Sequence, residues 1–237
     1  MARPKTREDG SACSGLLVVD KPVGLSSMDV VRRVRRAAGG VKTGHAGTLD
    51  PLATGVVICC LGQATRCVGQ LMDLAKTYET QVDLSAFTST DDREGERELV
   101  TVSQPPSESV LRDALEQFVG WIEQRPPAYS AVHVNGQRAY KLARSGQEVS
   151  LEARPVRIDR IELLAYEWPI AALRVVCGKG TYIRSLARDL GKALGTGGHL
   201  ASLRRTAVGP YDVQMAVTLD DLPSPLEQRH LLDPPRV

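Results

Sequence analysis

The apolar positions of this chain follow the period of strands in some segments and of helices in others. Continuous apolar runs at 15–22 and 56–62 predict buried strands, and the alternation at 76–86 predicts a strand with one exposed face. Three further segments carry a strand signal, namely 155–168, 171–180 and a final one at 199–213. The predicted strands are therefore spread along the whole chain.

Helical patterns lie between these strands. In the segment 23–40, valines form an apolar stripe, arginines fill the opposite face, and a Gly-Gly pair ends the helix. Ser26 and Asp29 have the spacing of a capping box, with Asp in place of the usual Glu. Other helices are predicted at 63–74, 107–120, 138–146 and 181–195.

The order of these elements predicts the fold class. Strands and helices mix without a strict βαβ repeat, and residues 87–98 are polar enough to predict a loop. Asn135-Gly136 is a strong signal for a hairpin turn. We therefore expect an α+β fold with a mixed, mostly antiparallel central sheet flanked by helices.

Composition narrows the class of protein. The 237 residues are 42% hydrophobic and 24% charged, as in soluble globular proteins of one or two domains. The net charge of +2 does not by itself indicate nucleic-acid binding, although the arginines cluster. Five cysteines without a Cys-x-x-Cys pair predict reduced thiols in a cytoplasmic protein. Residues 1–14 lack an apolar signal region and predict a disordered tail, and no segment is long enough to span a membrane.

The common cofactor motifs are missing from the sequence. There is no P-loop and no complete dinucleotide fingerprint, because the G-x-G of residues 178–180 lacks its third glycine. There is no H-E-x-x-H, no cysteine–histidine cluster with zinc spacing and no nucleophile elbow. We therefore expect neither a metal nor a cofactor.

The loop around Asp50 is the strongest candidate for chemistry. Glycines at 44, 47 and 55 surround this carboxylate, and Pro51 disfavours the helical backbone conformation for it. An ionised, rigidly placed aspartate is what nucleophilic or base catalysis needs. The alternative is structural: Asp50 as the N-cap of a helix that begins at Pro51.

Six segments of the chain together resemble the TruB family of tRNA pseudouridine synthases. The longest is GHAGTLDPLATGVVICCLGQATR, which resembles the family's signature loop. The others, in the family's order, are LLVVDKPVGLSSMDVV, AKTYET, RPPAYSAVHVNGQRAYKLARSGQEV, VVCGKGTYIRSLARDLG and LRRTAVGPY. The resemblance covers residues 15–215 and implies a pseudouridine synthase catalytic domain there.

The resemblance assigns roles to individual residues. Asp50 matches the catalytic aspartate, Tyr78 the tyrosine that stacks on the target base, and Arg184 the arginine that pairs with the aspartate. Four more positions match substrate-binding residues: the pocket residues Lys21 and Tyr182, His45, which holds the flipped-out RNA, and the pocket-wall Leu203. Taken alone, Arg184 has a structural alternative, which is an ion pair with Asp189 on the same predicted helix.

The implied reaction is isomerisation of uridine to pseudouridine at position 55, in the T-loop of tRNA. It requires a carboxylate, either as a nucleophile or to take a ribose proton, and a base taken out of its stack. An aromatic face for the extruded base is worth about 1–3 kcal/mol, which suits Tyr78. A tRNA-binding folding chaperone is the alternative function, and a glycosidase is disfavoured because no second carboxylate stands out.

The resemblance also implies partners. The expected substrate is the T-arm of tRNA, bound by a monomer without guide RNA or membrane. Residues 216–237 predict a short C-terminal extension, too short for the full RNA-binding PUA domain that many family members carry. Arginines are then expected to contact the RNA backbone, namely Arg32, Arg33, Arg36, Arg204 and Arg205.

Overall fold

The computed structural model describes residues 13–130, 133–134, 137–138 and 151–235. The chain divides into two compact units. Unit 1 holds the residues up to Thr77 and those from Arg204 onward, and unit 2 is Tyr78–Leu203. Strands β4 (Lys76–Asp83) and β12 (His199–Val208) run through both units.

Unit 1 is built on a mixed sheet with β3 at its centre. The paired strands are β1 (Gly15–Lys21), β2 (Thr43–His45), β3 (Thr54–Leu61), β13 (Tyr211–Asp212) and β14 (Val217–Thr218), together with the end of β12. β1 and β2 run antiparallel to β3, whereas β12 runs parallel to it. β14 lies parallel to β1 on the other side.

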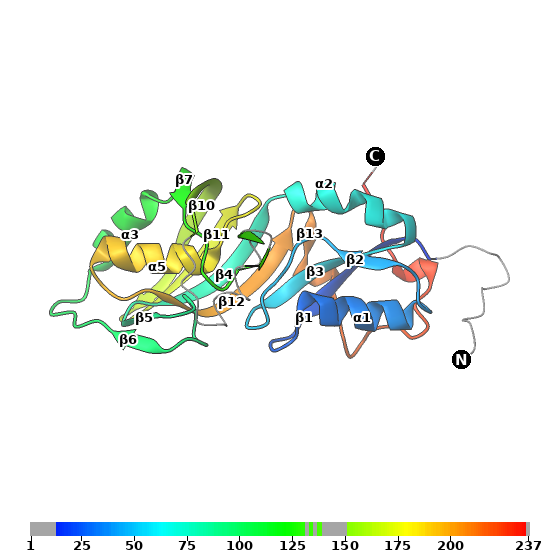
Figure 1. Ribbon diagram of the computed structural model, residues 1–237, viewed down its shortest axis with the longest axis horizontal. Helices are drawn as coiled ribbons and strands as arrows, with labels where there is room; N and C mark the ends of the chain where they lie inside the picture. Colours follow the sequence, from blue (N-terminus) through cyan, green and yellow to red (C-terminus); the bar gives the residue numbers. More distant parts are fainter. Residues whose placement is uncertain (1–12, 131–132, 135–136, 139–150, 236–237) are drawn as a thin grey trace. The chain divides into compact units, whose positions relative to one another are not determined.

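Helical segments cover both faces of this sheet, which explains the continuous apolar runs. Helix α1 (Ser27–Ala37) buries its valine stripe and begins with the predicted capping box. The 3₁₀ helix η1 (Gly62–Cys67) and helix α2 (Val68–Asp73) contribute to a core cluster with Leu16, Val18 and Ile58. Figure 1 shows α1 and α2 on opposite sides of the unit 1 strands. A strand that is buried on both faces has no polar side to alternate with.

Unit 2 places helices on one face of an antiparallel sheet. Its strand order is β4, β11 (Ile170–Cys177), β10 (Arg154–Glu167) and β7 (Gly120–Gln124). Helices α3 (Glu108–Glu116) and α5 (Ile183–Leu194) lie side by side against the sheet (Figure 1). Because only one face is covered, β11 alternates strictly between buried and partly exposed residues.

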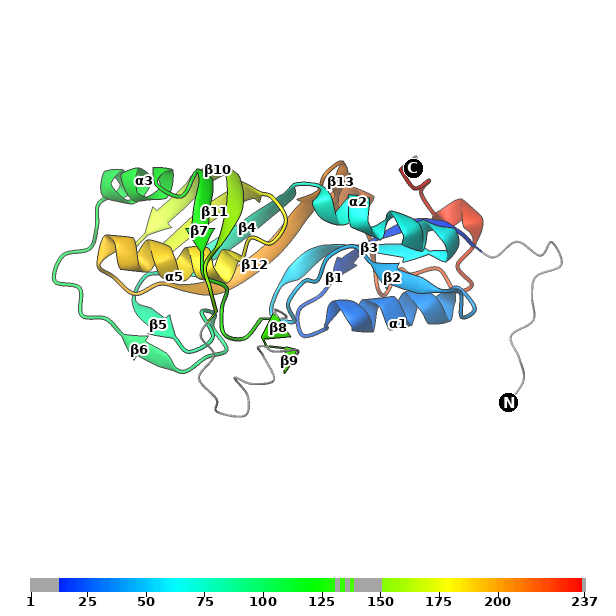
Figure 2. The same cartoon turned by 45° about the horizontal axis from the view of Figure 1, so that its top comes forward.

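Two short hairpins complete unit 2. β5 (Ala86–Thr88) pairs with β6 (Arg97–Leu99), and β8 (His133–Val134) pairs with β9 (Gln137–Arg138), as Figure 2 shows. The turn predicted at Asn135-Gly136 lies outside the described residues, although the strands on either side of it are antiparallel. Apart from Arg138, which belongs to β9, the helix predicted at 138–146 lies outside them, as does most of the predicted N-terminal tail.

The predicted α+β class is confirmed, and three local predictions change. The segment 87–98 is not all loop, because strands occupy both of its ends. The predicted helix at 63–74 begins as the 3₁₀ helix η1. Strand β7 was not predicted, and β12 is not the last strand because β13 and β14 follow. Within the described ranges, no helix combines the length and the hydropathy needed to cross a membrane.

Candidate active site

Asp50 lies in unit 1 on a tight turn that leads from β2 into β3. The turn is closed by the amide of Ala53, which donates to the carbonyl of Asp50 at 3.1 Å. Strand β3 then starts at Thr54, so no helix begins at Pro51. The structural alternative, Asp50 as a helix N-cap, is therefore wrong.

The start of α1 holds this turn in place. The Ser27 hydroxyl accepts a hydrogen bond from the Leu49 amide at 2.8 Å and donates to the Leu49 carbonyl at 3.1 Å. The Gly24 amide donates to the Pro51 carbonyl at 2.8 Å. The residues on both sides of Asp50 are thus tied to one rigid element, which limits the positions that its carboxylate can reach.

Lys21 is fully buried at the end of β1, close to the same turn. Its ammonium donates to the carbonyls of Leu25 at 2.7 Å, Pro22 at 2.9 Å and Pro51 at 3.4 Å. Burial lowers the pKa of Lys21 from 10.5 to about 8, and the charge of Asp50 partly opposes this shift. At neutral pH Lys21 is therefore mostly charged.

Arg205 occupies a different place from the one predicted. The side chain is 1% exposed, and its guanidinium donates to the carbonyls of Val56 at 2.7 Å, Gly47 at 3.2 Å and Thr48 at 3.3 Å. A buried guanidinium that is bonded to the backbone does not fit the predicted contact with RNA phosphate. The physical reason is the alternation of β12, which turns Arg205 inward toward the Asp50 loop.

Arg204 points the other way and forms an ion pair. Its two terminal nitrogens lie 2.7 and 3.1 Å from the carboxylate oxygens of Asp20, and one is 3.4 Å from the Thr54 hydroxyl. The Arg204 side chain is 39% exposed. A phosphate at this position would have to compete with the Asp20 carboxylate.

The close approach of β12 explains the glycine at position 55. Gly55 pairs with Arg205 in the parallel register, and it has φ of +105°. A Cβ on Gly55 would lie 2.1 Å from the Arg205 carbonyl oxygen. Only glycine fits here, both for its backbone conformation and for its lack of a side chain.

His45 is half-buried on β2, opposite Cys59 of β3. Burial lowers the pKa of His45, the positive charge of Arg205 lowers it further, and a hydrogen bond with the Gly47 backbone opposes the shift. The imidazole is therefore neutral at pH 7, which leaves one ring nitrogen to donate and one to accept.

In unit 2, Arg184 lies in the first turn of α5 and is 5% exposed. Its guanidinium donates to Asp92 Oδ2 at 3.3 Å, to the Thr90 carbonyl at 3.2 Å and to the Tyr129 carbonyl at 3.0 Å. Asp189 pairs instead with the neighbouring Arg188 at 2.9 Å. The alternative Arg184–Asp189 ion pair is therefore wrong.

Asp92 is a site residue that the sequence reasoning missed. It is 2% exposed, and its Oδ1 accepts hydrogen bonds from the Thr90 hydroxyl at 2.5 Å and the Glu94 amide at 3.0 Å. The polar segment 87–98, for which the sequence predicts only a loop, supplies a carboxylate that holds Arg184. The Thr-Asp-Asp run was the only signal, and it does not reveal which aspartate turns inward.

A second ion pair anchors this loop. Asp91 has φ of +60°, unusual for a residue with a side chain, and its Oδ2 lies 2.7 Å from Arg188 Nη1. Burial raises the pKa of Asp91, and Arg188 opposes the shift. The Arg188 contact thus helps to hold the Asp91 backbone in a conformation that directs Asp92 to Arg184.

The remaining predicted pocket residues also lie in unit 2. Tyr182 precedes α5, and the Gln124 side chain accepts from its amide at 2.8 Å and donates to its carbonyl at 3.1 Å. The Arg154 guanidinium lies 5.4 Å from the centre of the Tyr182 ring, a cation–π distance. Tyr78 is half-buried on β4, and Leu203 is 8% exposed on β12.

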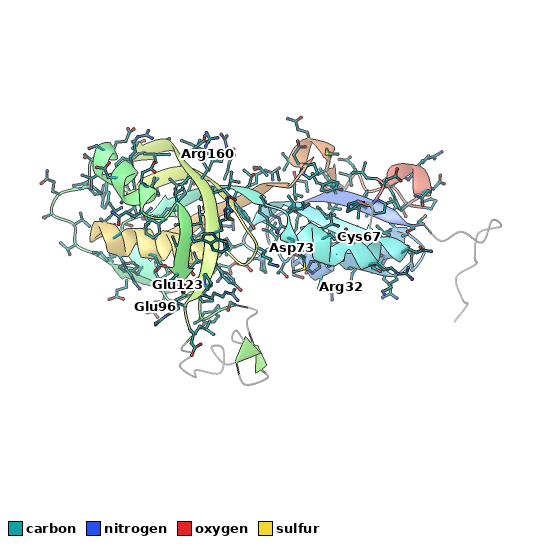
Figure 3. The ribbon with its side chains drawn as sticks, turned by 90° about the horizontal axis from the view of Figure 1, so that it is seen from above. Arg32, Cys67, Asp73, Glu96, Glu123 and Arg160 are labelled. Atoms are coloured by element: carbon teal, nitrogen blue, oxygen red, sulfur yellow. The ribbon has the colours of Figure 1, made fainter. Side chains whose placement is uncertain are left out.

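The structure therefore divides the predicted site residues between the units. Unit 1 brings together Lys21, His45 and the Asp50 turn, and unit 2 holds Tyr78, Tyr182, Arg184 and Leu203. On α1, Arg32, Arg33 and Arg36 are exposed, and Arg32 pairs with Asp29. Figure 3 shows Arg32 at the outer edge of unit 1. In the part of the chain that the structure describes, no three His, Cys, Asp or Glu side chains gather as a metal site would require.

Two family models match almost the whole chain. Residues 35–183 match the TruB family pseudouridylate synthase N-terminal domain. Residues 184–233 match the tRNA pseudouridylate synthase B C-terminal domain. The second match includes β13 and β14, and so extends past the region that the sequence motifs covered.

Curated relatives are similar over most of their own length. A tRNA pseudouridine synthase B of Ruegeria sp. is 49% identical over 219 residues, which are 91% of this chain and 72% of that protein. The tRNA pseudouridine synthase B of Bordetella parapertussis is 45% identical over 219 residues, which are 90% of this chain and 88% of that protein.

Solved structures share the fold. A chain of a Cbf5-Nop10-Gar1 complex superposes with a TM-score of 0.69 at 32% identity, over 88% of this chain and 53% of that one. A chain of the archaeal box H/ACA sRNP Nop10-Cbf5 complex gives 0.66 at 30% identity, over 93% of this chain and 57% of that one. This chain thus spans little more than half the length of those two.

Proposed function

This chain belongs to the TruB family of pseudouridylate synthases, and we propose that it isomerises uridine to pseudouridine in tRNA, at position 55 of the T-loop. The observation that carries the proposal is the Asp50 turn. It lies inside the segment that the family model matches, and backbone and side-chain hydrogen bonds hold the residues on both sides of the carboxylate.

The reaction breaks the N1–C1′ bond of the uridine, rotates the uracil and joins its C5 to C1′. A proton leaves C5 and one is taken up at N1, so the product is an isomer of the substrate. Asp50 is the proposed catalytic carboxylate, and it acts either as a nucleophile or as the base that takes a ribose proton. A rigid turn suits both roles, because a carboxylate held in one place loses little entropy in reaching the reactive geometry.

Unit 1 supplies an electrostatic setting for that carboxylate. The charge of Lys21 interacts favourably with that of Asp50, and the Lys21 ammonium itself donates to the Pro51 carbonyl beside it. The neutral imidazole of His45 suits a hydrogen bond to RNA rather than an ion pair with phosphate. For Tyr78, Tyr182, Arg184 and Leu203, the roles proposed are those that the family resemblance implies.

The proposed partner is the T-arm of tRNA, bound by a monomer in the cytoplasm without a guide RNA. The curated relatives from Ruegeria and Bordetella are named as tRNA enzymes, which supports this choice. The matched chains of the Cbf5-Nop10-Gar1 and Nop10-Cbf5 complexes are almost twice as long as the part they share with this one. Exposed arginines on α1, Arg33 and Arg36 among them, are the proposed contacts to the RNA backbone.

The test uses an unmodified tRNA transcript without added metal or cofactor. We expect pseudouridine at position 55 with the wild-type protein, mapped by a base-specific chemical adduct and primer extension. Asp50→Asn should abolish it while the dissociation constant for tRNA stays within about threefold. Asp113→Asn, which changes an exposed carboxylate on α3, is the matched control and should remain active. Tight binding without product in the wild type would favour the alternative, a tRNA-folding chaperone.

A further inference from the structure

One guanidinium bridges both arms of the Asp50 turn from its buried side. Arg205 donates to Gly47 and Thr48 on the arm that precedes Asp50, and to Val56 on the arm that follows it. The three distances lie between 2.7 and 3.3 Å. This side chain therefore links the two arms between which the catalytic carboxylate is presented, in addition to the backbone pairing of β2 with β3.

Arginine suits this bridge for geometric reasons. Its planar fork carries five N–H donors in fixed directions, whereas a lysine offers three donors on one atom and cannot span both arms equally well. The Arg205 side chain is 1% exposed, and its three hydrogen bonds within the described residues all go to backbone carbonyls. Its hydrogen-bonding capacity is used on the backbone of the turn and not on solvent or on a surface partner.

The backbone of the Asp50 loop approaches Arg205 closely at two glycines. Gly55 lies opposite Arg205 in the parallel register, so close that a Cβ would meet the Arg205 carbonyl oxygen. Gly47 adopts φ of +101° and presents its carbonyl to the guanidinium. The glycines of the Asp50 loop thus allow Arg205 to come close to the loop, and they also leave room for a substrate.

We propose that Arg205 is a positioning residue for catalysis, which holds the Asp50 turn in its reactive geometry by bridging its two arms, and that it does not contact RNA. The inference rests on the proposed function. It predicts that loss of Arg205 slows the chemical step and leaves tRNA affinity nearly intact. Loss of a phosphate-binding arginine would have the opposite effect. It would lower the affinity for tRNA and reduce the salt dependence of that affinity.

Two substitutions distinguish the effect of the bridging hydrogen bonds of Arg205 from the effect of its positive charge. Arg205→Lys keeps a positive charge but loses part of the fork, and Arg205→Met keeps the length and loses both. With enzyme in saturating excess over tRNA, we expect the single-turnover rate to fall about tenfold for Arg205→Lys and about a hundredfold for Arg205→Met. The dissociation constant for tRNA should stay within about threefold in both.

Hydrogen exchange of the loop amides gives a readout that does not depend on activity. The Leu49 amide, which donates to Ser27, and the Ala53 amide, which closes the Asp50 turn, should exchange faster in both variants than in the wild type. Leu71→Val is the matched control, because it removes a methylene from the same core without touching the turn. At an equal loss of thermal stability, Leu71→Val should leave both the rate and these amides unchanged.

A slowed rate with intact binding and faster loop exchange supports the proposal. An unchanged rate overturns it, and so does a loss of affinity large enough to explain the slower reaction. Should neither variant fold, exchange of the Arg205 Nε–H in the wild-type protein decides: slow exchange supports the bond to Val56, and exchange as fast as that of an exposed arginine overturns it. If the wild type makes no pseudouridine, the proposed function fails, while the exchange measurements still test the bridge.

Discussion

Arg184 and Asp92 form an ion pair that is almost completely shielded from water. The Arg184 Nη1 and Asp92 Oδ2 atoms are 3.3 Å apart, and the two side chains are 6% and 3% exposed. Hydrogen bonds to the carbonyls of Thr90 and Tyr129 occupy other donors of the guanidinium. Removal of one partner from such a pair takes away part of the compensation of a buried charge.

Asp92→Ala should therefore destabilise the protein strongly. We expect the free energy of unfolding to fall by about 3–5 kcal/mol, because the buried Arg184 loses its ion pair with the Asp92 carboxylate. Denaturant-induced unfolding followed by circular dichroism measures this loss. Asp113→Ala on the exposed face of α3 is the control and should change the free energy by less than about 0.5 kcal/mol. A small effect at Asp92 would show that the pair is not buried in solution.

The depressed pKa of Lys21 should make stability depend on alkaline pH. Burial lowers this pKa from 10.5 to about 8, so between these values the unfolded chain binds one proton more than the folded protein. The buried charge of Lys21 thus lowers the free energy of unfolding below about pH 8. This cost disappears as pH rises from about 8 to about 10.5, where Lys21 is neutral in both the folded and the unfolded chain. The contribution is on the order of 3 kcal/mol.

The measurement for Lys21 is a difference between two proteins. The free energy of unfolding of the wild type, minus that of Lys21→Met, should rise between pH 7.5 and pH 10.5, because methionine cannot titrate. Subtraction removes the titration of all other groups that the two proteins share. A difference that is flat over this window would place the pKa of Lys21 near its usual value.

Gly55→Ala should disrupt the pairing of β3 with β12. The added Cβ would lie 2.1 Å from the Arg205 carbonyl oxygen, and alanine disfavours φ of +105°. We expect a loss of several kcal/mol in unfolding free energy, on the order of 3 kcal/mol or more. Gly69→Ala in α2 has open space around the new Cβ and should be neutral or stabilise by about 0.5–1 kcal/mol. Equal effects of the two changes would contradict the close approach.

Arg33 and Arg36 of α1 should contribute to tRNA affinity through phosphate contacts. Arg33→Gln and Arg36→Gln are each expected to weaken binding and to reduce the slope of log affinity against log salt by about 1. Filter binding at several salt concentrations measures both quantities. Arg112→Gln removes an exposed arginine from α3 and should leave the slope unchanged. An unchanged slope in the α1 variants would show that this basic face of α1 faces solvent and does not contact the tRNA backbone.

Much of the fold could be predicted because its signals are local. The apolar run of β1, the capping box at Ser26 and Asp29, and the left-handed Gly195 that ends α5 each depend on neighbouring residues. Strand β7 was missed because it is short and lies at the edge of the sheet, where two of its five residues are exposed. β14 was missed because pairing with a distant strand, not local period, stabilises such a short element.

By itself, the sequence determined the family and the loop that carries Asp50, because these are contiguous patterns of residue types. Only the tertiary structure decided where the side chains of Arg204 and Arg205 lie. They are adjacent in the chain, yet one pairs with Asp20 at the surface and the other is buried against the Asp50 loop. The choice depends on the register of β12 against β3, and a shift by one residue would exchange their faces. In the same way, the contact of Arg184 with Asp92 joins residues 92 positions apart, which no local pattern encodes.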